Sequence, residues 1–205
     1  GIRNAYDLAF NKEGELFIHD SDMESDQGAP WYRPTSVYHI VAGGEYGWRS
    51  GWAKWPDYFV DAVPRLLDTE RGSPTGATVY NHYAFPARYH NALFLADWSE
   101  GRILAVKTKQ SGAGYSADSE TFLKGAPLNV SDLEVGPDGA LYFITGGRGT
   151  FGALYRVSWR GEIPEAYAQV TEGISEAIRQ PQLHSAWARQ KIAEVKKELG
   201  NEWGV

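Results

Sequence analysis

Two stretches, DLAFNKEGELFIHD (7–20) and DLEVGPDGALYFIT (132–145), share one pattern. Each opens with Asp-Leu, continues through a short apolar strand to a turn at Gly14 or Gly139, and closes with a second apolar strand. A third, looser copy, GATVYNHYAFPARYHNALFLAD (76–97), has a longer turn. Because internal repetition marks folds assembled from similar units, the chain is expected to consist of repeated β-units.

A further strand-like stretch follows each copy, and its residues are apolar or alternating, with β-branched and aromatic types favoured. These stretches lie at 36–42, 102–108 and 153–159, and outer strands are expected at 65–68 and 120–124. Four-stranded sheets repeated around an axis are the blades of a β-propeller. The sequence therefore predicts an all-β fold of about three four-stranded propeller blades, with a plain β-sandwich or another all-β fold as the alternative.

The predicted blades cannot close a ring by themselves, because propellers typically have about four to eight and open sheets leave unpaired edges. Residues 1–160 are therefore expected to be the C-terminal half of a larger propeller, completed by the same polypeptide or by another chain. Residues 161–182 suggest a linker. Residues 183–205 suggest a helical segment that leads to a further domain or packs on its own domain, with Ser185 capping the helix and Gly200 ending it.

Composition and charge restrict the partners. The formal net charge is −6 and no basic stripe is visible, so a nucleic-acid partner is not expected. The chain has no cysteine, which excludes disulfides, Cys-ligated zinc and a c-type haem attachment motif within it. It has no apolar run of about 18 residues, so no membrane span is expected in this segment.

The stretch HDSDMESDQG (19–28) places four acids at alternate positions, namely Asp20, Asp22, Glu24 and Asp26. Carboxylate oxygens are ligands for hard cations such as calcium. The spacing does not fit a helix–loop–helix calcium loop, because the sixth position from Asp20 is Ser25 rather than Gly, and the twelfth is Trp31 rather than Glu. Asp20 and Asp22, which lie nearest the end of the predicted strand, are the better metal candidates.

Two motifs, GIRNAYDLAFNKEGELFIHDSD (1–22) and GGEYGWR (43–49), resemble the bacterial glucose/sorbosone dehydrogenase family. These proteins are six-bladed propellers that use pyrroloquinoline quinone (PQQ). Other segments look like a subgroup found in large planctomycete-type proteins, in which helical repeats and often a c-type haem domain follow the propeller. Those segments are WYRPTSVYHIVAGGEYGWRSG (31–51), RGSPTG (71–76), ALFLADWSEGRI (92–103) and GPDGALYFITGGRGTFGALYRV (136–157).

The resemblance implies an extracytoplasmic dehydrogenase-like protein that oxidises a sugar or related alcohol with PQQ and calcium and passes electrons to a cytochrome. The family's Arg-Asn pair contacts the cofactor, and it would here be Arg3 and Asn4. The family's general-base histidine would lie in earlier blades, outside this chain, so no catalytic residue is assigned. The loop that holds the family's calcium would follow the strand ending near Asp20.

Three segments that precede inner strands, Arg3–Asp7, Ser73–Gly76 and Asn129–Asp132, are expected to converge at one mouth of the channel. The candidate cofactor-binding residues are accordingly Arg3, Asn4, Asp7, Thr75 and Arg148. Guanidinium groups suit carboxylates, and an asparagine amide offers both a donor and an acceptor. Two alternatives stay open: Arg3 pairs structurally with Asp7 or Asp20, and Arg148 braces the ring closure.

The sequence also departs from the family. Where relatives carry further basic residues for the cofactor carboxylates, this chain has small polar ones at Ser99, Asn129 and Ser131. The aromatic loop GWRSGWAKWPDYF (47–59) suits sugar stacking or packing between blades. The alternative function is therefore a non-catalytic propeller that binds glycans or protein partners.

Overall fold

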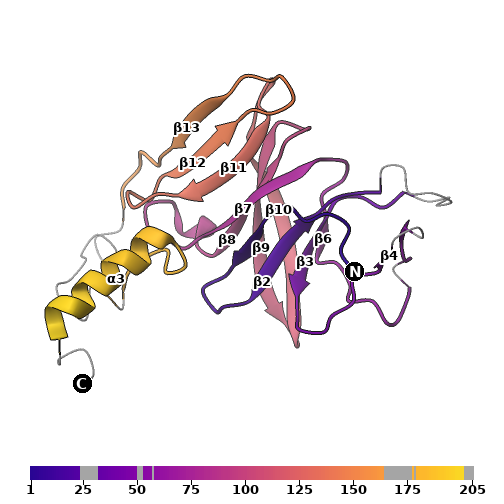
Figure 1. The fold of residues 1–205 in the computed structure, drawn as a ribbon, viewed down its shortest axis with the longest axis horizontal. Coiled ribbons are helices and arrows are strands. Elements are labelled where there is room, and N and C mark those ends of the chain that lie inside the picture. The colour runs from indigo at the N-terminus through magenta and orange to yellow at the C-terminus, as the bar shows by residue number, and fades with distance from the viewer. Residues whose placement is uncertain (24–31, 50–52, 57, 164–176, 178, 201–205) are drawn as a thin grey trace.

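The computed structural model describes residues 1–205 except 24–31, 50–52, 57, 164–176, 178 and 201–205. Most of its strands form three antiparallel sheets of three or four strands, each of which is a propeller-like blade (Figure 1). Blade 1 contains β1 (Leu8–Phe10), β2 (Leu16–Asp20), β3 (Ser36–Ile40) and β6 (Leu67–Asp68). Blade 2 contains β7 (Pro74–Tyr80), β8 (Ala92–Asp97), β9 (Arg102–Ser111) and β10 (Gly114–Lys124). Blade 3 contains β11 (Val130–Val135), β12 (Leu141–Thr145) and β13 (Ala153–Val157).

The predicted repeat is confirmed in blades 1 and 2, including the outer strands β6 and β10. Blade 3 differs from the prediction, because its described residues form three strands rather than four. The chain bends at Gly161 soon after β13, and the described residues that follow contain no strand. A two-stranded hairpin, β4 (Trp48–Arg49) with β5 (Ala53–Lys54), projects from blade 1, and a short 3₁₀ helix, η1 (Ala87–Tyr89), lies between β7 and β8.

The glycine turns of the repeat have the conformation that the sequence predicts. Gly14 has φ +87° and Gly139 has φ +71°, values that favour glycine over residues with a Cβ. Asn11 supports the first turn by accepting hydrogen bonds at Oδ1 from the backbone of Glu13 and Glu15. These turns set the register of the two strands on either side of them.

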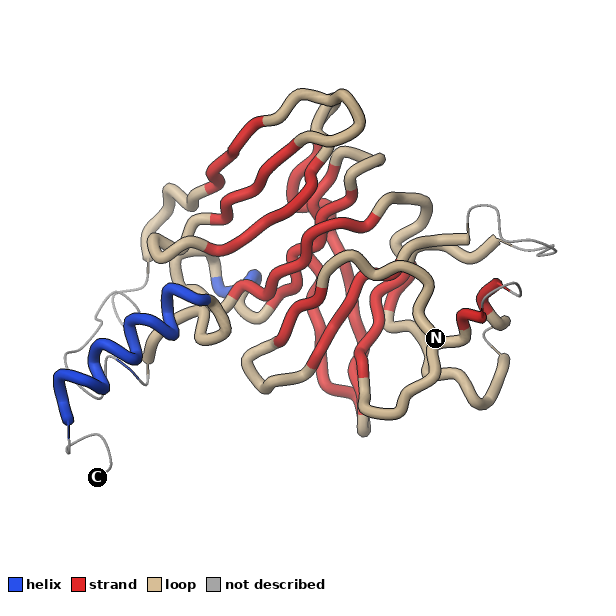
Figure 2. Tube along the Cα trace, in the orientation of Figure 1, coloured by secondary structure: helices blue, strands red, loops and turns tan. Residues whose placement is uncertain are grey.

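The three blades pack through both faces of blade 2. Strand β8 is buried along its whole length because Leu93 and Leu95 face blade 1, whereas Phe94 and Ala96 face blade 3. This explains why ALFLAD is a continuous apolar run rather than an alternating one. The first strands, β1, β7 and β11, lie side by side in the middle of the molecule (Figure 2).

The outward faces of blades 1 and 3 expose large apolar side chains. On β1, Leu8 is 51% exposed and Phe10 is 42% exposed, although Ala9 between them is buried against blade 2. On blade 3, Ile144 and Leu154 are 45% and 69% exposed. Apolar sheet faces normally pack against another layer of structure. The outer faces of blades 1 and 3 therefore resemble those of blades that have a neighbour on each side.

The C-terminal segment crosses the blades before the helix α3 (Ala186–Leu199). Gln182 bonds to the backbone of Val79 and Asn81 in blade 2, and His184 Nε2 bonds to Asn11 O in blade 1. Trp187 Nε1 donates to Val135 O in blade 3. The start of the helix therefore packs on its own domain.

The predicted helix boundaries are confirmed, since Ser185 accepts a hydrogen bond from Ala188 N and Gly200 is the C-cap. The predicted linker at 161–182 falls largely outside the described residues, and a domain beyond 183–205 stays a prediction. In the described parts of the chain, no helix is long and apolar enough to cross a membrane.

Candidate functional site

A cavity of about 390 Å³, here called the mouth pocket, opens where the segments that lead into the inner strands meet. Arg3 and Asn4 line it from the segment before β1, Thr75 from the start of β7, and Ser131 from β11. Arg148 lines it from the loop after β12. Four of the five predicted cofactor-binding residues are therefore brought together from distant parts of the sequence.

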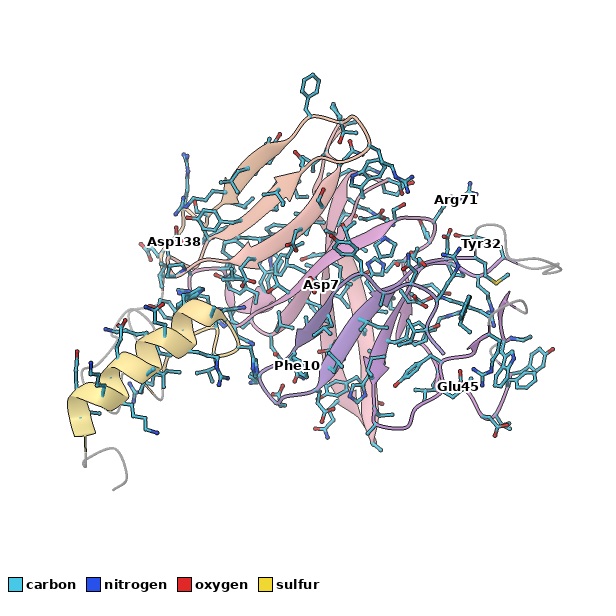
Figure 3. All side chains as sticks on the ribbon, in the orientation of Figure 1. Asp7, Phe10, Tyr32, Glu45, Arg71 and Asp138 are labelled. Atoms are coloured by element: carbon cyan, nitrogen blue, oxygen red, sulfur yellow. The ribbon has the colours of Figure 1, made fainter. Side chains whose placement is uncertain are left out.

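The fifth predicted residue, Asp7, does not line the mouth pocket. It lies near the centre of the molecule, between blades 1 and 2 (Figure 3). Its Oδ1 accepts from Leu8 N over 2.7 Å, and its Oδ2 accepts from Ala77 N over 2.8 Å. Through these contacts Asp7 links the first strands of blades 1 and 2, which is a structural role.

The Arg3–Asn4 backbone is held by Asp20, the last residue of β2. Asp20 Oδ1 accepts from Asn4 N over 2.8 Å, and Oδ2 accepts from Arg3 N over 3.2 Å. The guanidinium of Arg3 donates from Nη1 to Ser21 Oγ over 2.9 Å. Asp20 therefore orients two of the residues that line the mouth pocket.

Asp20 is buried, and its charge is compensated by a lysine from the projecting hairpin, Lys54. Lys54 Nζ lies 3.0 Å from Asp20 Oδ2, and it also donates to Ser21 O over 2.8 Å. Burial lowers the pKa of Lys54, and the neighbouring Asp20 opposes that shift. Three donors therefore share the two carboxylate oxygens of Asp20, namely the amides of Arg3 and Asn4 and the ammonium group of Lys54.

Asp97, the last residue of β8, repeats this arrangement in blade 2. Its Oδ1 accepts from Ser73 N over 2.8 Å in the segment before β7. Its Oδ2 accepts from Arg102 Nε over 2.9 Å. A Cβ added at Gly72 would collide with Asp97 Oδ2, so the backbone approaches this carboxylate as only glycine allows.

Asp22, the other predicted metal ligand, is 3% exposed. Its Oδ2 accepts from Tyr32 Oη over 2.9 Å, whereas its buried Oδ1 has no hydrogen-bond partner among the described residues. The pKa of Tyr32 is raised to about 12, mainly by burial and to a smaller extent by the hydrogen bond to Asp22. Within the described part of the chain, no three or more His, Asp or Glu side chains form a group that could hold a metal. Glu24 and Asp26 lie outside the described residues.

Arg148 and Trp98 form one wall of the mouth pocket. The guanidinium carbon of Arg148 lies 5.8 Å from the centre of the Trp98 ring, within the range of a cation–π contact. Trp98 Nε1 donates to Gly146 O over 2.6 Å, which fixes the ring. Arg148 is exposed and has φ +49°, an uncommon value for a residue with a Cβ.

At the positions where the sequence departs from the family, the polar side chains form hydrogen bonds with other atoms of this chain. Asn129 Nδ2 donates to Trp98 O, and Ser131 Oγ donates to Gly146 O. Ser99 Oγ donates to Asp97 Oδ1 over 3.4 Å. Thr75 Oγ1 likewise donates to Val130 O and joins blade 2 to blade 3. These contacts brace the rim of the mouth pocket.

Lys54 and Trp98 are two residues of this region that the sequence did not lead us to expect. The position of Trp98 carried a signal, because it follows a strand-ending Asp just as Ser21 follows Asp20. Lys54 gave none, since it lies in a projecting hairpin outside the repeat and reaches Asp20 only in three dimensions.

The fold is similar to about half of several solved sugar dehydrogenases. A putative oxidoreductase (glucose dehydrogenase) from Thermus thermophilus matches 75% of this chain with 26% identity and a TM-score of 0.60. The soluble aldose sugar dehydrogenase of Escherichia coli matches 78% with 21% identity and a TM-score of 0.58. The PQQ-bound aldose sugar dehydrogenase of Streptomyces coelicolor matches 77% with 17% identity and a TM-score of 0.54.

The chain spans less than half of each of these structures, namely 45%, 46% and 44% of their lengths. No known family's sequence model matches the chain, and no curated protein is significantly similar to it. The likeness therefore shows the fold, and function has to be argued from the site.

Proposed function

We propose that this chain forms part of a propeller that binds PQQ at the mouth pocket and oxidises a sugar or related alcohol. The observation that carries the proposal is the convergence of Arg3, Asn4 and Arg148 around one cavity of about 390 Å³. Cavities of roughly 300–1,000 Å³ with a few polar groups suit small ligands. The solved relatives are described as glucose or aldose sugar dehydrogenases, and one of them is PQQ-bound.

The donors around the mouth pocket suit a planar quinone that carries carboxylates. Guanidinium groups donate in a fixed fork to carboxylates, and the Asn4 amide can donate to a carbonyl oxygen. Lys54 compensates the buried charge of Asp20, so that carboxylate does not repel an anionic ligand. When bound, the quinone would supply the hydride-accepting chemistry. The residues of this chain would bind and orient it.

We assign the proposed calcium ion to Asp22 rather than to Asp20. The buried Oδ1 of Asp22 has no hydrogen-bond partner among the described residues, which leaves a carboxylate oxygen available for a hard cation. Backbone carbonyl oxygens would supply further ligands.

The remaining parts of the proposal concern the partners and the subgroup. The exposed apolar faces that carry Leu8 and Leu154 would be covered by further blades. Electrons would pass to a c-type cytochrome domain or protein, and the protein would act outside the cytoplasm. Membership of the planctomycete-type subgroup belongs to the same proposal.

The test uses the full-length polypeptide in which the chain occurs. It is incubated with PQQ and CaCl₂, unbound quinone is removed by gel filtration, and dye reduction is followed with a panel of aldoses. Retained quinone absorbance together with dye reduction supports the proposal. Absence of retained quinone at micromolar concentration contradicts it.

A second candidate function is non-catalytic glycan binding, favoured by the aromatic loop near β5. Arg49 lies over the Trp55 ring at 4.4 Å, and Trp55 stacks on Phe59 at 4.6 Å. Tyr58, next to Phe59, is 80% exposed. An exposed ring backed by a stack can receive a sugar face. Binding of oligosaccharides that is lost in Tyr58→Ala, without quinone binding, would favour this function.

A further inference from the structure

We propose that the ammonium group of Lys54 takes the place of a metal ion at the end of β2, and that Lys54 is a positioning residue for the Arg3–Asn4 backbone. The positioning of a quinone by that backbone rests on the proposed function. The substitution of a metal by Lys54 does not, because it concerns contacts within the chain.

The surroundings of Lys54 resemble those of a bound cation. Its Nζ is 3.0 Å from a carboxylate oxygen of Asp20 and donates to the carbonyl oxygen of Ser21 over 2.8 Å. Carboxylate and backbone carbonyl oxygens are the ligand types that hard cations take. The side chains of Lys54 and Asp20 are 5% and 1% exposed, so the ion pair is closed off from water.

Lys54 acts on the mouth pocket indirectly, through its ion pair with Asp20. Lys54 does not line that pocket, whereas Arg3, Asn4 and Ser21 do. Asp20 accepts the backbone N–H groups of Arg3 and Asn4, and Ser21 accepts from the Arg3 guanidinium. A buried carboxylate left without its cation becomes protonated or draws in water, and either change loosens these hydrogen bonds.

Blade 2 supplies an independent parallel. Asp97 also ends the second strand of its blade, holds the backbone that leads into the first strand, and pairs with a cationic side chain, Arg102. Arg102 Nη2 also donates to Thr69 O over 2.6 Å, so this cation likewise bridges a carboxylate and a carbonyl. The same structural task is therefore performed twice by an internal cation.

The first experiment measures thermal unfolding of the full-length protein in EDTA and in CaCl₂, for the wild type and for Asp20→Asn. The expected result is the same calcium-induced shift in melting temperature for both proteins. A calcium-induced shift that is present in the wild type and lost in Asp20→Asn would overturn the proposal.

Hydrogen exchange on the wild type covers the case in which Asp20→Asn does not fold. Calcium should change the protection of the Arg3 and Asn4 amides no more than that of the Ser73 amide, which donates to Asp97 in blade 2. Calcium-dependent protection confined to Arg3 and Asn4 would show that a metal, not Lys54, organises Asp20.

The second experiment measures the dissociation constant of PQQ for Lys54→Met, Lys54→Arg and the surface control Lys107→Met. Lys54→Met should weaken binding by about tenfold or more, the range for removing a supporting contact behind a ligand site. Lys54→Arg, which keeps the charge, should recover most of that loss, and Lys107→Met should match the wild type. Equal affinity in Lys54→Met and the wild type refutes the positioning role. Absence of quinone binding in the wild type refutes the proposed function instead, and the calcium experiments still stand.

Discussion

Arg102 Nε donates to Asp97 Oδ2 over 2.9 Å, and the side chain of Asp97 is completely buried at the end of β8. The pair joins the segment before β7 to the second strand of the same blade. Removing the cation alone leaves an uncompensated buried carboxylate. Arg102→Met should therefore lower the free energy of unfolding by about 3–5 kcal/mol, measured by urea denaturation. The double variant Asp97→Asn/Arg102→Met should lose less than the sum of the two single variants, and strict additivity would contradict the pairing.

Stability should depend on pH through His19. Burial lowers the pKa of His19 from 6.5 to about 4, so the folded protein holds this ring neutral. Its Nε2 lies 2.8 Å from Thr69 Oγ1, whereas its buried Nδ1 has no partner among the described residues. As the pH falls, His19 binds a proton in the unfolded chain before it does so in the folded protein. Its contribution to the free energy of unfolding is therefore complete above pH 6.5 and is lost as the pH falls towards 4.

The size of the His19 effect is about 3 kcal/mol over that interval. Urea denaturation at a series of pH values measures it, and His19→Gln should reduce the slope of stability against pH. Some slope should remain, because burial also lowers the pKa of His82 to about 4. A slope that is the same in His19→Gln and the wild type would count against a neutral buried ring.

The C-terminal segment should stabilise the propeller through Gln182. Its side chain donates to Val79 O and accepts from Asn81 N, and both contacts are largely buried. Gln182→Ala leaves these backbone groups without partners, at a cost of about 1–3 kcal/mol in unfolding free energy. Gln190→Ala is the matched control, since Gln190 is exposed on α3 and bonds only to Glu194 among the described contacts. Equal destabilisation by the two variants would contradict a role for this segment in holding the blades.

The exposed faces of blades 1 and 3 should be buried in the complete protein. Leu154 is 69% exposed on β13, so Leu154→Asp would change little if that face met only water. If another blade packs there, a buried charge is created and the melting temperature of the full-length protein falls by several degrees. Ser119→Asp, at an exposed position of β10, is the control and should leave the melting temperature unchanged. A Leu154→Asp melt that matches the control would show that nothing covers this face.

Much of the fold follows from the sequence because the repeat carries its own signals. Glycine turns at Gly14 and Gly139, alternating β1 and the doubly buried β8 each reflect a local rule of burial or backbone conformation. The same repeat predicts that the segments containing Arg3, Thr75 and Ser131 meet at one mouth, since equivalent positions in successive blades lie around one axis.

The contacts that depend on loops could not be predicted in this way. Nothing in the spacing of Lys54 indicates that its hairpin folds back onto Asp20. The acidic stretch suggested a metal site because charges of one sign were visible along the chain, whereas the compensating cation lies 34 residues later, at position 54 against position 20. Asp7 was placed at the mouth because it adjoins Arg3 and Asn4, but the strand turns its carboxylate towards Ala77.

The most direct test of the central claim is the dissociation constant of PQQ for the full-length protein, measured by equilibrium dialysis. The exposed guanidinium of Arg148 lines the mouth pocket beside Trp98, so the wild type should bind at micromolar concentration or below. Arg148→Gln should weaken binding by about tenfold, the loss expected for one charge-assisted hydrogen bond. Arg160→Gln, at an exposed arginine outside the pocket, should bind like the wild type. No binding by the wild type, or equal binding by wild type and Arg148→Gln, would contradict the assignment of the mouth pocket as a quinone site.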